Sequence, residues 1–171
     1  MKKILFLTIT LFSFYTVLAQ KTTKPTNEFT IEGLVEHELV INLDSLKGYA
    51  TENIDSVVIT NHLGERKSVL KKIKVIPIKN FLDKAVIHVE SPKQLSEFYI
   101  IFIAEDGYKV VYSWNEIFNT KVGQSIFIIA EKDGKGIANL DDRTAVFCHS
   151  DFMTGRRYVK SLKKIIVKRI E

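Results

Sequence analysis

The stretch FYIIFIAEDGYKVVYSWNEIF, residues 98–118, decides the fold. An apolar run at residues 99–104 leads into Glu105, Asp106 and Gly107, and a second apolar run follows at residues 108–112. Aromatic and β-branched residues on both sides of an Asp-Gly pair indicate a β-hairpin, and Gly107 can adopt the positive φ that the turn requires. We therefore predict a central hairpin, with a first arm that is buried on both faces because nearly every residue in it is apolar.

A short helix is expected directly after this hairpin. Ser113 is a residue type that caps helices, and Glu116 follows three residues later. This spacing permits a capping box, in which each of the two side chains satisfies a backbone N–H group at the start of the helix. The hairpin and its helical turn form the predicted central unit of the domain.

The amino-terminal segment has the features of a secretory signal peptide. Two lysines precede an apolar run at residues 4–18, and the small residues Val17 and Ala19 stand at positions −3 and −1 of a cleavage site. A membrane anchor is the alternative, but the run is short for a membrane span. We expect residues 1–19 to be removed, residues 20–27 to be flexible, and the mature protein to be periplasmic or secreted with no membrane span.

Charge and cysteine content indicate which partners, disulfides and metal sites to expect. Loss of residues 1–19 leaves 23 basic and 20 acidic residues, so the formal charge falls from +5 to +3. This small excess gives no indication of a nucleic-acid partner. Cys148 is the single cysteine and lies in an apolar run, which predicts an inert thiol in the core and no internal disulfide. No histidines or cysteines have the spacing of a metal site, and none is predicted.

The rest of the chain alternates between short apolar runs and turn residues, which indicates a β-rich α+β domain over residues 28–171 with mixed sheets and a few short helices. We expect one compact domain because no long linker or repeat is present. The predicted strands lie at residues 29–35, 39–43, 56–60, 68–75, 125–130, 143–149 and 165–170, and the predicted helical segments at residues 44–49 and 77–85.

Four phrases occur in a fixed order along the chain: residues 31–35 with 39–46, residues 75–85, residues 105–108 with 114–117, and residues 151–160 with Leu162 and Ile165. Together they resemble the molybdopterin-binding domain of the sulfite-oxidase family. The second phrase is similar to the family's "GVPLxxLLxxA", with Val75 where glycine is usual. The resemblance covers nearly all of the mature chain. It implies a mixed, largely β fold and, in active members, a pterin dithiolene that holds molybdenum.

The resemblance also implies one cysteine thiolate as a ligand of the metal. The corresponding segment, residues 56–74, contains no cysteine, and Thr60, Asn61 and His62 stand about where the ligand is expected. A hydroxyl or an amide does not replace a soft sulfur donor. The absent thiolate argues against redox catalysis, so no catalytic residue is predicted, and molybdopterin is implied as a cofactor only by the resemblance.

Six residues form the candidate cofactor-binding site that the resemblance implies: Asn61, His62, Asp151, Arg156, Arg157 and Lys160. Guanidinium groups suit phosphate oxygens. The alternative is that the basic residues only protect a sheet edge from aggregation. Two functions stay open: an exported, non-catalytic domain that binds an anionic small molecule or a protein partner, and a molybdopterin-dependent oxidoreductase with an altered metal ligand.

Overall fold

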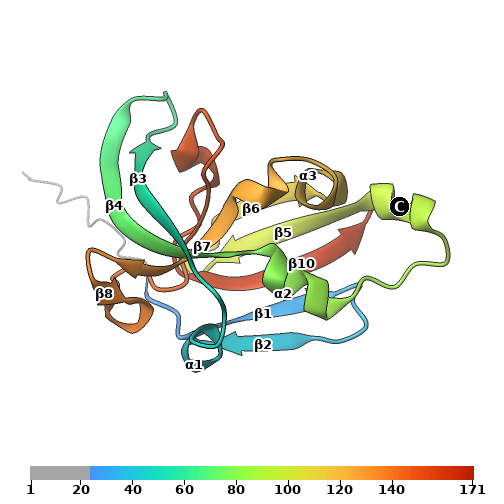
Figure 1. The fold of residues 1–171 in the computed structure, drawn as a ribbon. Helices are drawn as coiled ribbons and strands as arrows, with labels where there is room; N and C mark the ends of the chain where they lie inside the picture. Colours follow the sequence, from blue (N-terminus) through green and yellow to red (C-terminus); the bar gives the residue numbers. More distant parts are fainter. Residues whose placement is uncertain (1–23) are drawn as a thin grey trace, which may run out of the picture.

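The computed structural model describes residues 24–171, so the expected signal peptide lies outside the described residues. Its first sheet has five strands in the order β2-β1-β10-β5-β6 (Figure 1). β10 pairs parallel with β1 and antiparallel with β5, so the last strand lies between the first strand and the central hairpin. The strands are β1 (Glu28–Gly33), β2 (Leu39–Asn42), β5 (Phe98–Ala104), β6 (Lys109–Ser113) and β10 (Leu162–Arg169).

The second sheet is built on a long hairpin that rises from the rest of the molecule in Figure 1. Its strand order is β3-β4-β7-β8, and β9 also pairs with β7. The buried side chains of this sheet divide between two core clusters: one set, including Val57, Leu70 and Phe147, forms a smaller cluster of its own, and another, including Ile76, Ile128 and Val146, joins the larger cluster of the first sheet. The strands are β3 (Glu52–Thr60), β4 (Arg66–Pro77), β7 (Ile126–Lys132), β8 (Lys135–Gly136) and β9 (Val146–Cys148).

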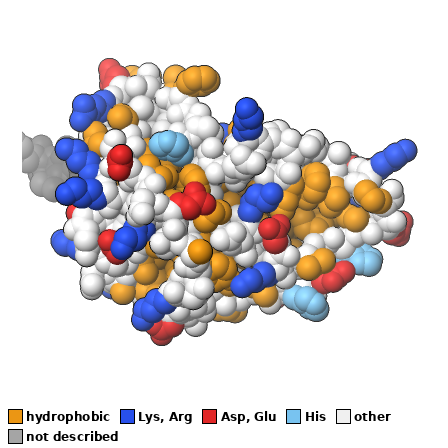
Figure 2. All heavy atoms as spheres, in the orientation of Figure 1, with side chains coloured by type: hydrophobic (Ala, Val, Ile, Leu, Met, Phe, Trp, Pro, Cys, Tyr) orange, Lys and Arg blue, Asp and Glu red, His pale blue; other side chains and the backbone are white. Residues whose placement is uncertain are grey.

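The helices are short, and the two sheets with these few helices confirm the α+β prediction. Among residues 24–171, no helix has the length and apolar character needed to cross a membrane. Figure 2 shows apolar side chains at the surface between α2 and α3. The helices are α1 (Leu43–Leu46), α2 (Lys79–Ala85) and α3 (Trp114–Phe118), with 3-10 turns η1 (Pro92–Glu97), η2 (Gly123–Ser125), η3 (Ile137–Asn139) and η4 (Thr154–Arg157).

The central hairpin and its capped helix are confirmed. β5 and β6 pair around the Gly107 turn, and Ser113 and Glu116 form both hydrogen bonds of a capping box at α3. The prediction that β5 is buried on both faces is wrong. Ile100 and its alternate neighbours are buried, whereas Ile101 and the residues on its side are only half-buried. Within residues 24–171 no layer covers that side of the first sheet, where β10 presents side chains such as Lys164, which is ion-paired and partly exposed.

Three predicted boundaries need correction. The cap of α1 is Asn42, whose side chain accepts the Ser45 N–H, so the helix starts before the predicted segment at residues 44–49. Pro77 is the last residue of β4 and does not start α2. The strand predicted at residues 143–149 is reduced to β9, because Thr144 has a φ of 54° and ends the extended conformation.

The two faces of β5 make a testable pair. Ile100 is fully buried, so Ile100→Ala should lower the free energy of unfolding by about 3 to 4 kcal/mol through lost burial and a residual cavity. Ile101→Ala on the open face should cost about 1 kcal/mol. Urea denaturation measures both values. Equal losses would show that the half-buried face contributes as much packing as the buried one.

Candidate functional site

The candidate site forms where η4 packs against the end of β3. The Thr154 hydroxyl donates to the Val58 carbonyl at 2.6 Å and accepts the Thr60 N–H at 3.1 Å. A Cβ placed on Gly155 would lie 1.8 Å from the Thr60 carbonyl oxygen, so the close contact requires glycine. The carboxyl-terminal loop is therefore fixed on the β3–β4 hairpin.

The Asn61 side chain stabilises the β3–β4 turn through hydrogen bonds within the turn. Its side-chain oxygen accepts the N–H groups of Leu63 and Glu65 at 2.9 and 3.0 Å, and its amide donates to the Glu65 carboxylate at 2.8 Å. Arg156 then donates to the His62 carbonyl at 2.8 Å. Asn61 thus holds the turn, and Arg156 joins this turn to η4.

A cavity of about 390 Å³ opens beside this junction. Arg156 has no carboxylate within ion-pair distance in the part of the chain that the structure describes, so its charge is not neutralised. Lys160 pairs with Asp142 at 2.9 Å. Burial raises the pKa of Tyr158, which keeps its phenol neutral. The lining residues are His62, Ala104, Asp106, Tyr108, Gly155, Arg156, Tyr158 and Lys160.

Arg157 points into a different environment. Its guanidinium lies over the Tyr112 ring at 4.4 Å from the centroid. It forms two hydrogen bonds with the Asp151 carboxylate and one with Glu116 at 3.1 Å. The Asp151 hydrogen bond raises the pKa of Arg157, so the group stays charged. Arg157 and Asp151 therefore brace the loop before η4 and do not line the cavity.

Cys148 is enclosed in the core, with no exposed surface. Its sulfur lies 3.4 Å from the Ser150 hydroxyl and 3.9 Å from an Arg157 amino group. Burial raises the pKa of the Cys148 thiol. The geometry agrees with the predicted inert core cysteine.

The structure thus divides the six predicted site residues into three groups. His62, Arg156 and Lys160 line one cavity. Asn61 adjoins it as the residue that shapes the turn, and Asp151 pairs with Arg157 behind it. The sequence analysis placed Asp106 in the hairpin turn and left Tyr108 out of the candidate site, although both line the cavity. Both residues belong to the third family-like phrase, residues 105–108, and this was the sequence feature that could have placed them in the site.

A thiolate-bound molybdenum centre does not fit these residues. Thr60 is 8% exposed and its hydroxyl accepts the Gly155 N–H at 3.4 Å, while Asn61 is engaged in its turn. Cys148 is fully buried on β9. Residues 24–171 contain no group of three or more histidine, cysteine, aspartate or glutamate side chains arranged for a metal ion.

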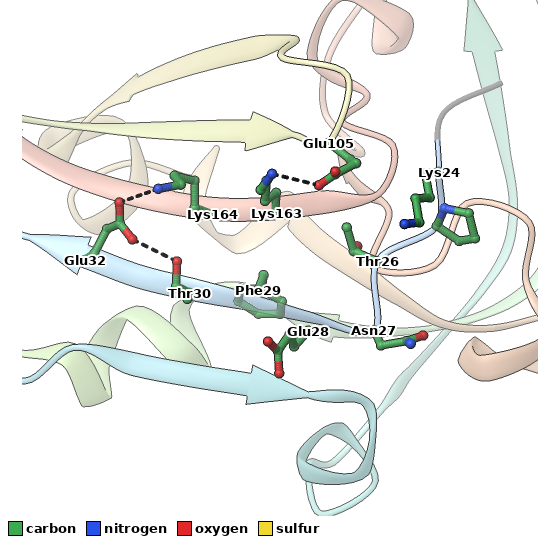
Figure 3. Close-up of a pocket in the computed structure, with 11 residues that line it drawn as sticks. Lys24, Thr26, Asn27, Glu28, Phe29, Thr30, Glu32, Glu105, Lys163 and Lys164 are labelled. Atoms are coloured by element: carbon green, nitrogen blue, oxygen red, sulfur yellow. Dashed lines mark hydrogen bonds and ion pairs between the residues drawn. The ribbon is translucent and has the colours of Figure 1, made fainter. Parts of the chain in front are cut away.

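A second cavity, of about 410 Å³, lies where residues 24–27 cross β1 and β10 (Figure 3). Two of its lysines are ion-paired: Lys164 with Glu32 at 2.8 Å and Lys163 with Glu105 at 3.2 Å. The hydrogen bond from Lys164 lowers the pKa of Glu32. Three lysines and three glutamates line it, so this cavity has no excess of positive charge and is a weaker candidate for an anion than the one beside η4.

No protein-family model and no curated protein matches the chain. Among solved structures, the crystal structure of the sulfane dehydrogenase SoxCD from Paracoccus pantotrophus is similar, with a TM-score of 0.58 and 11% sequence identity. The match covers 84% of this chain and 39% of that chain, so this chain spans well under half of its neighbour. At this identity the likeness shows the fold alone.

The two neighbouring arginines should differ in their effect on stability. Arg157→Ala leaves the Asp151 carboxylate, whose side chain is 12% exposed, without its partner. We expect a loss of about 2 kcal/mol, below the cost for a fully buried pair because Arg157 is itself 23% exposed. Arg156→Ala should change stability by less than about 0.5 kcal/mol. Chemical denaturation compares the two, and equal effects would contradict the bracing role.

Cys148 should be unreactive toward a thiol reagent in the native protein and should react fully after unfolding. Its pKa is higher in the folded state, so its contribution to stability is complete below the unfolded pKa of about 8.5 and is lost as the pH rises through the folded value. Rapid modification under native conditions would show that the thiol is accessible.

Proposed function

We propose that the chain is an exported, non-catalytic domain on the sulfite-oxidase scaffold that binds an anionic small molecule or a protein partner. Its binding face is the cavity lined by His62, Arg156 and Lys160. The sequence resemblance supports the scaffold, as does the structural likeness to sulfane dehydrogenase, a distant relation of fold to a molybdoenzyme of that family. The non-catalytic role rests on one observation: the residues beside the cavity where a metal-binding cysteine is expected are Thr60, Asn61 and His62, and none of them provides a thiolate.

An anionic group is the ligand that the cavity suits best. Arg156 has no ion-pair partner among the described residues, Lys160 adds a second cation that is shared with Asp142 at 2.9 Å, and Asp106 is the one lining carboxylate, so the lining has an excess of positive charge. Arg156 uses one amino group on the His62 carbonyl, which orients the guanidinium and leaves further N–H groups for oxygen atoms of a ligand. Tyr108 donates its hydroxyl proton to the Arg156 carbonyl and fixes the same segment from the other side.

A molybdopterin-dependent oxidoreductase with an altered metal ligand is the second candidate. The likeness to a dehydrogenase favours it. Among Thr60, Asn61 and His62, the His62 imidazole has no hydrogen-bond partner within the described residues, so this ring is the group left to act as a ligand. Imidazole is a harder donor than thiolate and suits a different range of metals.

Metal analysis separates the two candidates. Protein purified from its native compartment should contain no stoichiometric molybdenum, and acid oxidation should release no fluorescent pterin, because the scaffold lacks the thiolate ligand. Stoichiometric molybdenum together with a pterin would contradict the non-catalytic proposal and support the second candidate.

Anion binding tests the cavity itself. Arg156→Ala and Lys160→Ala should each weaken the binding of inorganic phosphate or pyrophosphate by about tenfold or more, because a charge-assisted hydrogen bond is lost. Isothermal titration calorimetry measures the affinities, and Lys168→Ala, an exposed residue at the far end of β10, is the matched control. Unchanged affinity in all three variants, or no binding by the unaltered protein, would remove the cavity from consideration.

A further inference from the structure

Three large apolar side chains are exposed where the β3–β4 turn meets the loop before η4. Phe152 is 101% exposed, Leu63 65% and Met153 42%. The two loops are neighbours, since a Cβ on Gly64 would lie 3.6 Å from the Met153 side chain. Figure 1 shows both loops projecting at the same upper end of the molecule. We call Leu63, Phe152 and Met153 the apolar tip.

The backbone that carries the tip is held on both sides. Asp151, directly before Phe152, is fixed by Arg157, and Thr154, directly after Met153, is fixed on β3. The Met153 carbonyl also accepts the Arg156 N–H at 2.9 Å. The fold therefore holds the phenyl ring of Phe152 in water on an anchored loop. Such preorganisation lowers the entropic cost of placing the ring in an apolar environment on binding.

Basic residues follow directly after the two loops that carry the apolar tip. Arg66, Lys67 and Arg156, which we call the basic collar, are exposed and have no ion-pair partner among the described residues. Of the nearby carboxylates, Asp151 is ion-paired with Arg157, whereas Glu65 and Asp106 accept hydrogen bonds from the neutral Asn61 amide and Tyr108 N–H, so the three cations of the collar outnumber these two carboxylates. Apolar groups at the end of the molecule with cations behind them complement the acyl boundary and the anionic headgroups of a membrane surface.

We propose that this end of the molecule docks reversibly on an anionic lipid surface, with the apolar tip in the interface and the basic collar against the headgroups. The charge complementarity of the collar favours this occupant. The apolar side chains also project from two loop tips and line none of the cavities described above, a shape suited to shallow insertion. The proposal does not depend on the ligand of the cavity beside η4.

Vesicle binding tests the proposal. Protein obtained by expressing the full chain should bind vesicles of phosphatidylcholine with roughly 30% phosphatidylglycerol and should bind pure phosphatidylcholine vesicles much less. Phe152→Ser should weaken binding about tenfold. Arg66→Gln combined with Lys67→Gln should weaken it about 25-fold at low ionic strength, since each basic residue near an anionic surface contributes about fivefold. Co-sedimentation gives the partition coefficients.

Matched changes away from the tip are the controls. Val40→Ser and Ile170→Ser alter apolar side chains that are 60% and 66% exposed, and Lys93→Gln with Lys168→Gln removes two exposed charges. These variants should bind as the unaltered protein does. Equal losses in tip and control variants, or no preference for the anionic vesicles, would overturn the proposal.

Two further measurements distinguish a lipid surface from a second copy of the chain as the occupant of the apolar tip. If the unaltered protein does not bind vesicles, and analytical ultracentrifugation shows a dimer that Phe152→Ser abolishes, the proposal is overturned. The occupant of the apolar tip is then a second copy of the chain. Brominated acyl chains should strongly quench the tryptophan fluorescence of the Phe152→Trp variant. They should not quench that of the unaltered protein, whose single tryptophan is Trp114 in α3. Phosphate affinity should be unchanged in Phe152→Ser, so failure of docking and failure of the anion cavity are distinguishable.

Discussion

The close contact between η4 and the end of β3 is the constraint on which the candidate site depends. Two hydrogen bonds of the Thr154 hydroxyl and the absence of a side chain at Gly155 bring a late segment against residues nearly a hundred positions earlier. Without this contact, Arg156 would not reach the His62 carbonyl, and Gly155 and Arg156 would not line the cavity. The same contact also places the apolar tip and its basic collar at one end of the molecule.

The two arginines of the closing phrase show how adjacent residues take different roles. Arg157 has its charge satisfied by Asp151 and Glu116 and its plane covered by Tyr112, so it stabilises the loop. Arg156 has no carboxylate partner in the described part of the chain and remains available to a ligand. A structural ion pair thus supports a neighbouring guanidinium that stays open to a ligand. Under the proposed function, this arrangement binds an anion and contributes no redox chemistry.

Local patterns in the sequence predicted the parts of the fold that depend on near neighbours. The hairpin around Gly107 and the capping box of Ser113 and Glu116 are set within a few residues, and both were correct. The strand predicted at residues 143–149 was too long, because the positive φ of Thr144 depends on packing against distant segments. The half-buried face of β5 was missed because composition alone does not reveal whether a layer covers a sheet.

The candidate site was predictable only in outline. The resemblance singled out His62, Arg156 and Lys160, but the separation of Arg157 from them follows from contacts with Asp151 and Tyr112 that no local pattern encodes. The most direct test of the account is an NMR titration of the ¹⁵N-labelled protein with phosphate. Shifts confined to the amides of residues 62–63, 106–108 and 155–160 are predicted. Shifts centred on Cys148, or on the cavity between β1 and β10, would contradict the account.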